Sequence, residues 1–138
     1  MVRHRRAERD VVREVLLAVG SLPSVRCWRN NTGTLVVQDR RVAFGLRGSS
    51  DVLGVVGPSG RLLAIECKSD RGRMTSHQRA FAEMVVRFGG LHVVARSAAD
   101  ALDALASAGV AGAAAARASR LDVYERLRDA GPPRAQPG

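Results

Sequence analysis

The sequence predicts an α/β fold in which helices flank a mixed β-sheet. Apolar residues recur at helical spacing near the N-terminus, several short β-rich segments follow, and two more helical patterns then alternate with one buried strand. This order of elements is typical of a sheet with helices packed on it. The 138 residues, of which 46% are hydrophobic, suffice for one compact domain with one core.

The first helix is predicted over residues 7–19. Val12, Val15 and Val19 recur at helical spacing on one face, and Gly20 ends the pattern. An amphipathic helix of this kind packs its apolar face on the core.

Short β-rich segments separated by turn-forming residues follow this helix. Residues 38–40 make a basic turn between two of them, which predicts a hairpin whose turn projects into solvent. The Gly-Pro-Ser-Gly run at residues 57–60 is a strong turn, so the segments on either side of it should pair antiparallel. The predicted strands are residues 25–29, 35–37, 41–44, 51–56 and 61–68.

A second helix is expected to begin near Thr75. Thr75 and Gln78 have the spacing of a capping box, in which each side chain bonds to the backbone of the other residue. The apolar face of this helix carries Phe81, Val85 and Phe88, and the two glycines that follow end it.

The remaining elements complete the predicted domain. A buried strand is expected at residues 91–95, and Ser97 with Asp100 makes a capping box for a last amphipathic helix. We therefore expect a domain over residues 1–107. The alanine-rich residues 108–138 are expected to add a helix and a flexible tail.

Charge and cysteine content limit the class of partner. Lys and Arg exceed Asp and Glu by 22 to 13, and the net charge of +9 makes nucleic acid the expected partner. The alternative is a basic protein that its charge keeps soluble. Two isolated cysteines and three scattered histidines argue against a zinc site and for a reducing compartment. No apolar run reaches the about 20 residues of a membrane span, so we expect a cytoplasmic protein with no membrane partner.

Residues 62–68 form an apolar strand that ends in two opposite charges. Residues two apart on a strand share one face, so Glu66 and Lys68 point the same way while Cys67 faces the core. The preceding strand begins at Asp51, and antiparallel pairing could bring its carboxylate to Glu66. Mg²⁺ favours such a site, because one or two carboxylates leave positions for water and phosphate oxygens. Lys68 could then orient the attacking water or offset charge in the transition state.

A simpler alternative is an exposed salt bridge between Glu66 and Lys68, with Asp51 capping the start of its strand. Surface ion pairs of this kind are common and contribute little stability. The combination of the three residues with a basic surface favours the catalytic interpretation.

Several short motifs in this region occur together. They are Arg29-Asn30-Asn31-Thr32-Gly33, Phe44-Gly45, Gly48-Ser49-Ser50-Asp51, Ile65-Glu66-Cys67-Lys68 and Gln78. Over residues 8–105 this set resembles the VRR-Nuc group of the PD-(D/E)xK nuclease superfamily. The resemblance implies a restriction-endonuclease-like fold and hydrolysis of phosphodiester bonds with Mg²⁺ or Mn²⁺. In one departure, Ser50 stands where many superfamily members have proline.

The resemblance also implies roles for individual residues. Asp51 and Glu66 would bind the metal ion, together with the backbone carbonyl of Cys67. Lys68 would act at the attacking water, and Gln78 would support the site from the second helix.

The superfamily also uses a glutamate from the first helix, as a catalytic residue and metal ligand. Glu8 is the candidate, because at about 100° per residue it lies on the apolar stripe, whereas Asp10 and Glu14 point to the opposite side. The alternative is an acidic residue that the helix dipole favours in the first turn. Gln78 likewise has the alternative of a capping role with Thr75.

Candidate DNA-binding residues surround these motifs. Arg29, Asn30 and Asn31 could contact phosphate or line the cleft, although the asparagines also suit a turn. Other arginines, Arg40 and Arg41 among them, are expected to supply a general attraction to DNA. The predicted DNA-binding residues are Arg29, Asn30, Asn31, Arg47, Ser49, Ser50, Arg71 and Arg73.

The expected function is an endonuclease acting on duplex or branched DNA. Relatives of VRR-Nuc type are small phage or bacterial proteins proposed to act on branched DNA such as Holliday junctions, with DNA repair as the setting. Because one site makes one cut, a symmetric resolvase would be a homodimer, which we expect.

Two other functions stay open. The first is a catalytically silent nuclease-fold protein that binds DNA as an accessory factor, against which the intact Asp51, Glu66 and Lys68 argue. The second is a basic RNA-binding protein of unrelated fold, but an aromatic content of 4% offers few stacking platforms for bases.

Overall fold

A computed structural model describes residues 7–120, which form a mixed α/β structure. Helices α1 (Glu8–Gly20), α2 (Ser76–Arg87) and α3 (Ala98–Ser107) occur in the predicted order, and a further helical stretch runs from residue 113 to residue 120, the last one described. The predicted α/β class is confirmed. The strands are β1 (Val25–Arg29), β2 (Gly33–Val37), β3 (Arg40–Phe44), β4 (Val52–Val56), β5 (Arg61–Cys67) and β6 (Leu91–Ala95).

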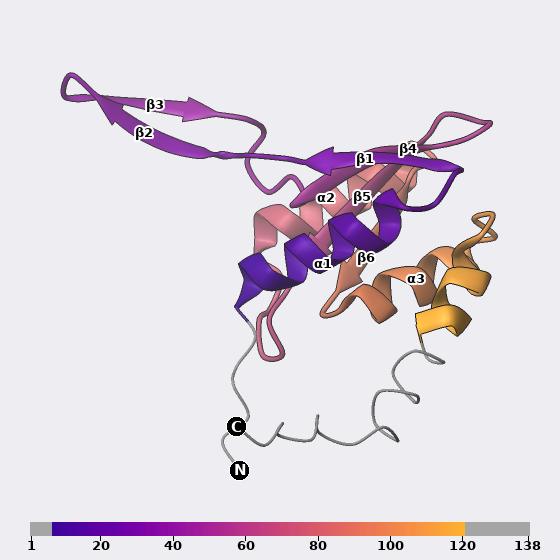
Figure 1. Cartoon of the computed structure of the whole chain (residues 1–138). Helices are drawn as coiled ribbons and strands as arrows, with labels where there is room; N and C mark the ends of the chain where they lie inside the picture. The colour runs from indigo at the N-terminus through magenta and orange to yellow at the C-terminus, as the bar shows by residue number, and fades with distance from the viewer. Residues whose placement is uncertain (1–6, 121–138) are drawn as a thin grey trace, which may run out of the picture.

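The main sheet has the strand order β1-β4-β5-β6 (Figure 1). β4 pairs antiparallel with both β1 and β5, whereas β5 and β6 run parallel. The predicted antiparallel pairing across the turn at residues 57–60 is confirmed. A parallel pair needs a crossover connection, and α2 supplies it between β5 and β6. The sheet is therefore mixed, as predicted.

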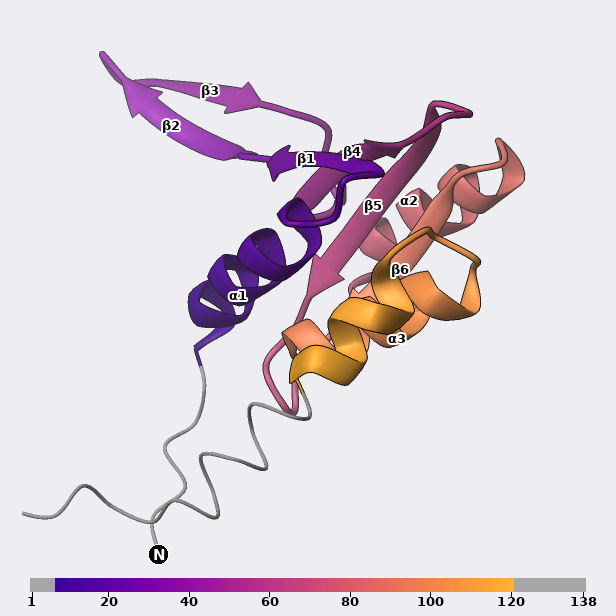
Figure 2. The same ribbon diagram turned by 45° about the vertical axis from the view of Figure 1, so that its right-hand side comes forward.

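β2 and β3 form a separate two-stranded hairpin that stands away from the main sheet (Figures 1 and 2). Gln38 and Asp39 form its turn with φ values of 49° and 59°, and a tight two-residue turn of this type requires positive φ at both positions. Arg40 already belongs to β3, so the turn is shorter than predicted. All residues of both strands are exposed.

Helices cover both faces of the main sheet. α1 and α3 pack on one face and α2 packs on the other (Figure 2). The larger core lies under α1 and α3 and includes Val15, Ile65 and Leu102, whereas Ala64 and Phe81 belong to a smaller cluster under α2. The side chains of neighbouring residues in β5 thus point to opposite faces of the sheet and pack in different clusters, as the pleat of a strand requires.

Two local expectations at helix ends need correction. Phe88 is 80% exposed, because α2 ends at Arg87 and Phe88 lies at its C-cap beyond the apolar face. The Ser97 hydroxyl accepts a hydrogen bond of 3.1 Å from the Asp100 N–H, as a capping box requires. The Asp100 carboxylate, however, accepts from the Arg96 N–H at 2.9 Å, so only half of the predicted box forms.

The packed core continues beyond α3. Val110 and Ala113 are buried in the larger core, so residues after 107 contribute to the same unit. The division of the chain after residue 107 stays a prediction, and the predicted tail at 121–138 lies outside the described residues. None of the helices within residues 7–120 has the length and apolar character that a membrane span would require.

Candidate active site

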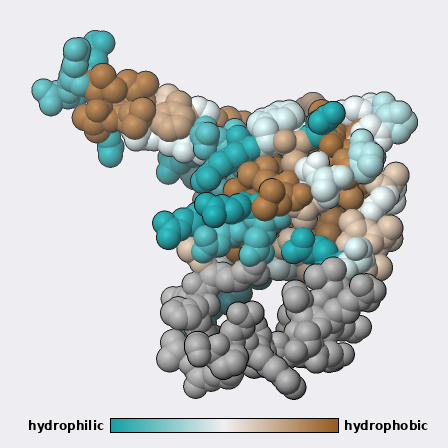
Figure 3. All heavy atoms as spheres, viewed as in Figure 1, coloured by the Kyte–Doolittle hydropathy of each residue, from teal (hydrophilic) through white to brown (hydrophobic). Residues whose placement is uncertain are grey.

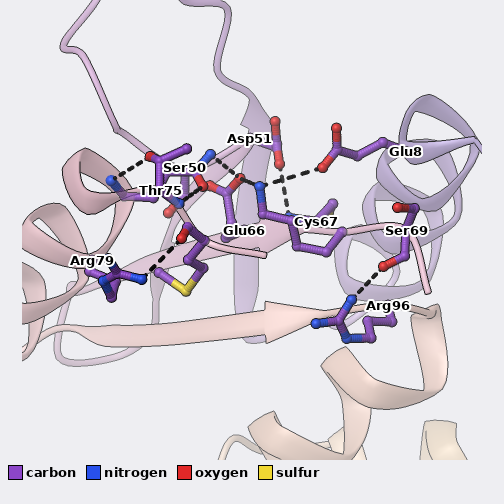
Figure 4. Close-up of polar contacts among 12 residues, drawn as sticks. Glu8, Ser50, Asp51, Glu66, Cys67, Ser69, Thr75, Arg79 and Arg96 are labelled. Atoms are coloured by element: carbon purple, nitrogen blue, oxygen red, sulfur yellow. Dashed lines mark hydrogen bonds and ion pairs between the residues drawn. The ribbon is translucent and has the colours of Figure 1, made fainter. Parts of the chain in front are cut away.

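Asp51 and Glu66 meet where the β4–β5 pair ends. Val52 pairs with Ile65 in the antiparallel register, so the residues one step further along each strand lie opposite each other. Oδ2 of Asp51 accepts a hydrogen bond of 2.8 Å from the Cys67 N–H, which fixes the carboxylate against β5 (Figure 4). The structure thus brings the two predicted carboxylates together.

Lys68 joins Glu66 in a buried ion pair. Its Nζ lies 3.4 Å from Oε1 of Glu66. Glu66 is only 2% exposed and Lys68 only 7%. The simpler interpretation of an exposed salt bridge is therefore wrong. Removing two charges from water is costly, so a buried pair at the end of a strand gives little stability by itself.

Glu8 reaches the same lysine from the first turn of α1. Its Oε1 lies 3.6 Å from Lys68 Nζ, and its side chain is half exposed (Figure 4). Val12 and Val15, which share its helix face, are buried, as the predicted stripe requires. Glu8 also occupies the helix turn that favours an acidic residue, so the helix-dipole alternative is compatible with this contact. Its role as a catalytic residue and metal ligand stays a prediction.

Gln78 contacts Glu66 and caps α2 at the same time. Its Nε2 donates a hydrogen bond of 2.8 Å to Glu66 Oε1. Its Oε1 accepts from the Thr75 N–H at 2.9 Å, while the Thr75 hydroxyl accepts from the Gln78 N–H at 3.2 Å. The two roles considered for Gln78 are therefore compatible, because the capping box orients the amide toward Glu66.

The surroundings of Glu66 favour its protonated form. Burial, followed by repulsion from the Asp51 carboxylate, raises the pKa of Glu66 to about 7 from an ordinary value of 4.5. The ammonium of Lys68 acts in the opposite direction and offsets only part of this rise. A pKa this far from the ordinary value, produced by burial and a specific charged neighbour, is typical of functional sites.

One oxygen of Glu66 is left without a hydrogen bond. Within residues 7–120, Oε2 of Glu66 is buried and has no hydrogen-bond partner. Such an atom is costly unless something satisfies it, and a cation beside two carboxylates would do so. The same residues contain no group of three or more His, Cys, Asp or Glu side chains placed to hold a metal ion. Mg²⁺ needs only one or two carboxylates, so Asp51 and Glu66 fit this ion.

The thiol of Cys67 takes no part in this chemistry. Burial, and then the nearby carboxylates of Asp51 and Glu66, raise the pKa of Cys67 to about 12, so the reactive thiolate does not form near neutral pH. Its side chain packs in the larger core, as the strand alternation predicts. The role of its backbone carbonyl as a metal ligand stays a prediction.

Asn30 holds the loop that carries Asp51. Its Nδ2 donates to the Ser49 hydroxyl at 2.7 Å and to the Ser50 carbonyl at 3.0 Å, and its backbone N–H donates to the Asp51 carbonyl at 2.8 Å. Asn30 is therefore a positioning residue, which favours the structural alternative for this asparagine over contact with DNA.

Ser50 is buried, which argues against its predicted contact with DNA. Its side chain is 1% exposed, and its hydroxyl lies 3.1 Å from His92 Nε2 on β6. Burial lowers the pKa of His92, which favours the neutral ring, and a neutral ring suits a hydrogen bond to a hydroxyl. This contact joins the loop before Asp51 to β6.

Arg96 is a further supporting residue that the sequence pattern does not single out. Its Nη1 donates a short hydrogen bond to the Ser69 carbonyl, directly after Lys68 (Figure 4). The guanidinium thereby holds the start of the loop that leads from β5 to α2. An isolated arginine after β6 carries no spacing signal for this contact.

The other predicted DNA-binding residues lie at the surface. Ser49 is partly exposed, and its hydroxyl donates to the Leu46 carbonyl at 2.7 Å. Arg71 and Arg73 belong to the loop between β5 and α2. Contact with DNA stays a prediction for these residues. The exposed ones are Arg29, Asn31, Arg47, Arg71 and Arg73.

No protein-family model, curated protein or solved structure matches the chain. The interpretation of the site therefore depends on its geometry and on the sequence motifs.

Gly48→Ala is expected to destabilise the fold and to displace the Asp51 loop. Gly48 has φ of +82°, and an added Cβ would lie 2.4 Å from the His77 carbonyl oxygen, which as backbone cannot move freely. Gly60 is a matched control, because its φ is +76° but an added Cβ meets nothing within 4 Å. We expect Gly60→Ala to cost about 1–2 kcal/mol of unfolding free energy, and Gly48→Ala about 2 kcal/mol more. Urea unfolding measures both, and equal losses would contradict the steric argument.

Proposed function

We propose that this protein is a metal-dependent endonuclease that hydrolyses phosphodiester bonds in DNA. The observation that carries the proposal is the buried carboxylate of Glu66. Its Oε2 has no hydrogen-bond partner among the described residues, and Asp51 repels it from the neighbouring strand. Two ionised carboxylates held together in this way repel each other, and a metal ion between them would offset that repulsion. Mg²⁺ or Mn²⁺ would remove the repulsion and supply the chemistry of phosphodiester hydrolysis.

The resemblance to VRR-Nuc nucleases supports the same proposal. We infer a restriction-endonuclease-like fold, in which α1 and α2 cover opposite faces of the mixed sheet and each sends one side chain to the end of β5. The residues with implied roles form one group of neighbouring side chains. They are Glu8, Asp51, Glu66, Lys68 and Gln78.

The residues of the chain have separate tasks in this proposal. The bound metal ion supplies polarisation of the phosphate and a lowered pKa of bound water. Asp51 and Glu66 hold it, with the Cys67 carbonyl and Glu8 as the further predicted ligands. Gln78 binds one oxygen of Glu66 and leaves the other for the metal ion. The ammonium of Lys68 orients the attacking water or offsets the negative charge that develops on the phosphate oxygens.

The proposed substrate is duplex or branched DNA. The formal net charge of +9 attracts a polyanion, and the exposed Arg71 and Arg73 follow Lys68 closely in the chain. A homodimer would supply the two cuts that symmetric cleavage of a branched substrate requires. Gel filtration of the protein on junction DNA tests this part of the proposal, and a monomer alone would contradict it.

Cleavage of labelled DNA tests the proposed activity. Purified protein is incubated with junction, flap and linear duplex DNA in the presence of Mg²⁺, Mn²⁺ or EDTA. We expect cleavage with either metal ion and none with EDTA or with the Asp51→Asn variant, whose amide is a weaker metal ligand. Binding of DNA without cleavage under every condition would contradict the proposal and support the accessory-protein alternative.

Metal binding is expected to depend on pH through Glu66. Because the pKa of Glu66 is about 7 without metal, the ion must displace a proton below that pH. The affinity for Mn²⁺ should therefore fall by about tenfold for each pH unit below about 7 and level off above it. Calorimetric titration of Mn²⁺ into DNA-free protein measures this. An affinity that stays constant from about pH 6 to about pH 8 would contradict the assignment of Glu66 as a ligand.

A further inference from the structure

A pocket lies at the base of the β2–β3 hairpin, beside the candidate active site. Its volume is about 440 Å³, within the about 300–1,000 Å³ of small-ligand sites. Gly45 and Gly48 line it, and only Ser49 and Ser50 separate Gly48 from Asp51 in the chain. The pocket and the carboxylates are therefore joined by one short loop.

Close backbone packing fixes this loop. An added Cβ at Gly45 would lie 2.6 Å from Thr32 Cγ2, and one at Gly48 would lie 2.4 Å from the His77 carbonyl oxygen. His77 immediately precedes Gln78, which binds Glu66. The wall of the pocket is thus pressed against the same helix turn that positions the active site.

The pocket is cationic. Among the described residues that line it, Arg41 and Arg47 are charged and none is Asp or Glu. Within residues 7–120, the ion pairs involve Lys68 and Arg117, not these two arginines. Thr32 and Thr34 also line the pocket. Guanidinium groups beside residues that carry hydroxyl groups are suited to a phosphate group.

The hairpin presents different chemistry on its two faces. Arg41 pairs with Val36 and faces the pocket, whereas its neighbour Arg40 pairs with Val37 on the opposite face. That opposite face also carries Leu35 and is largely apolar. Figure 3 shows the hairpin standing out from the body of the molecule with hydrophobic residues along it. A two-stranded ribbon of this kind is an element that a DNA groove can admit.

We propose that this pocket binds a backbone phosphate of the DNA strand, next to the phosphate that is cleaved, through Arg41 and Arg47. The inference rests on the proposed function, because it takes DNA as the substrate. Exposed residues of the hairpin border the pocket, so a DNA strand can reach it from solvent. The contact fixes the position of the strand relative to Asp51 and Glu66.

Binding of labelled DNA in EDTA tests the pocket without cleavage. Arg41→Ala is expected to weaken binding by about tenfold, as loss of one charge-assisted contact implies, and to reduce the slope of log affinity against log salt by about one. Arg40→Ala is the matched control, because it removes the same charge one residue away on the other hairpin face. Its effect should be at most about threefold. Equal effects of the two variants would overturn the proposal, and Arg41→Lys should recover part of the affinity.

A neutral substitution in the DNA identifies the contact. Replacing single phosphates by methylphosphonates should weaken binding to the unaltered protein at one position near the cleaved bond, and Arg41→Ala should abolish that difference. If Arg41→Ala and a methylphosphonate reduced the affinity independently at every position, so that their effects multiplied, the proposal would be overturned. The pocket would instead belong to a free phosphate compound if Arg41→Ala weakened the binding of pyrophosphate and left DNA binding unchanged. That result would also overturn the proposal. Absence of cleavage with Mg²⁺ would instead contradict the proposed activity, because binding in EDTA is measured separately.

Discussion

Lys68→Ala is expected to lower the rate of metal-dependent DNA cleavage by at least about 100-fold while DNA affinity stays nearly unchanged. The Lys68 ammonium is buried between the carboxylates of Glu66 and Glu8, 3.4 Å and 3.6 Å away. It is therefore held beside the proposed metal site and is withdrawn from the surface that would contact the DNA backbone. Single-turnover cleavage and binding in EDTA measure the two quantities separately.

The control for this variant is Arg79→Ala, which removes a cation from the exposed surface of α2. The Arg79 guanidinium donates to the Met74 carbonyl at 3.2 Å and lies apart from Glu66 (Figure 4). We expect the control to change cleavage by less than about threefold. Lys68→Met retains more of the side-chain packing than Lys68→Ala does. Loss of cleavage in both variants would therefore not be explained by unfolding. Parallel loss of binding and cleavage in both Lys68 variants would contradict the assigned role.

The convergence of the site could be predicted from the sequence because it depends on local signals. The turn at residues 57–60 determines that β4 and β5 are antiparallel, and this register puts Asp51 opposite Glu66. Helical periodicity likewise selects Glu8, since only one face of α1 is turned to the core. Alternation along β5 separates Glu66 and Lys68 from Cys67. Each of these inferences needs only the geometry of one strand, helix or turn.

The supporting contacts could not be predicted in this way. Asn30 bonds to Ser49 across 19 residues, and Ser50 contacts His92 across 42 residues. Such contacts depend on how segments that are distant in the sequence come together in the folded sheet, and a single polar residue carries no periodic signal for them. For the same reason the sequence predicts Ser50 as a surface residue of a motif loop, although it is buried and its hydroxyl lies 3.1 Å from His92 on β6, with β5 between β4 and β6 in the strand order.

The position of the hairpin away from the main sheet is a second feature that local sequence patterns do not predict. Leu35, Val36 and Val37 have the composition of a buried strand, yet they are 57%, 69% and 53% exposed. Burial is decided by whether another layer packs on the strand, and β2 pairs only with β3. The cationic pocket at its base depends on this detachment, because a hairpin inside the main sheet would have no open face there.

Glu66→Gln is expected to abolish metal binding and yet to stabilise the metal-free protein above neutral pH. The folded protein retains the proton of Glu66 up to a pKa of about 7, whereas the unfolded chain loses it near the ordinary value of 4.5. The stability that this proton provides is fully present below the unfolded pKa and is lost as the pH rises through about 7. Glutamine is neutral at every pH, so the variant does not undergo this loss. Its amide can also donate to the Asp51 carboxylate, whereas Oε2 of Glu66 has no hydrogen-bond partner in the part of the chain that the structure describes.

Urea unfolding in EDTA over a range of pH measures this effect. Near about pH 5 the two proteins should be similar, and near about pH 8 the variant should be more stable by about 1–3 kcal/mol. Excess Mn²⁺ should stabilise the unaltered protein and leave the variant unchanged, since only a ligand that binds the folded state raises its stability. Glu83→Gln, on the exposed surface of α2, removes the same charge and should produce no comparable pH dependence. A Glu66→Gln variant that is less stable than the unaltered protein at every pH would mean that the ionised carboxylate stabilises the fold. The repulsion attributed to the two carboxylates in EDTA would then not exist.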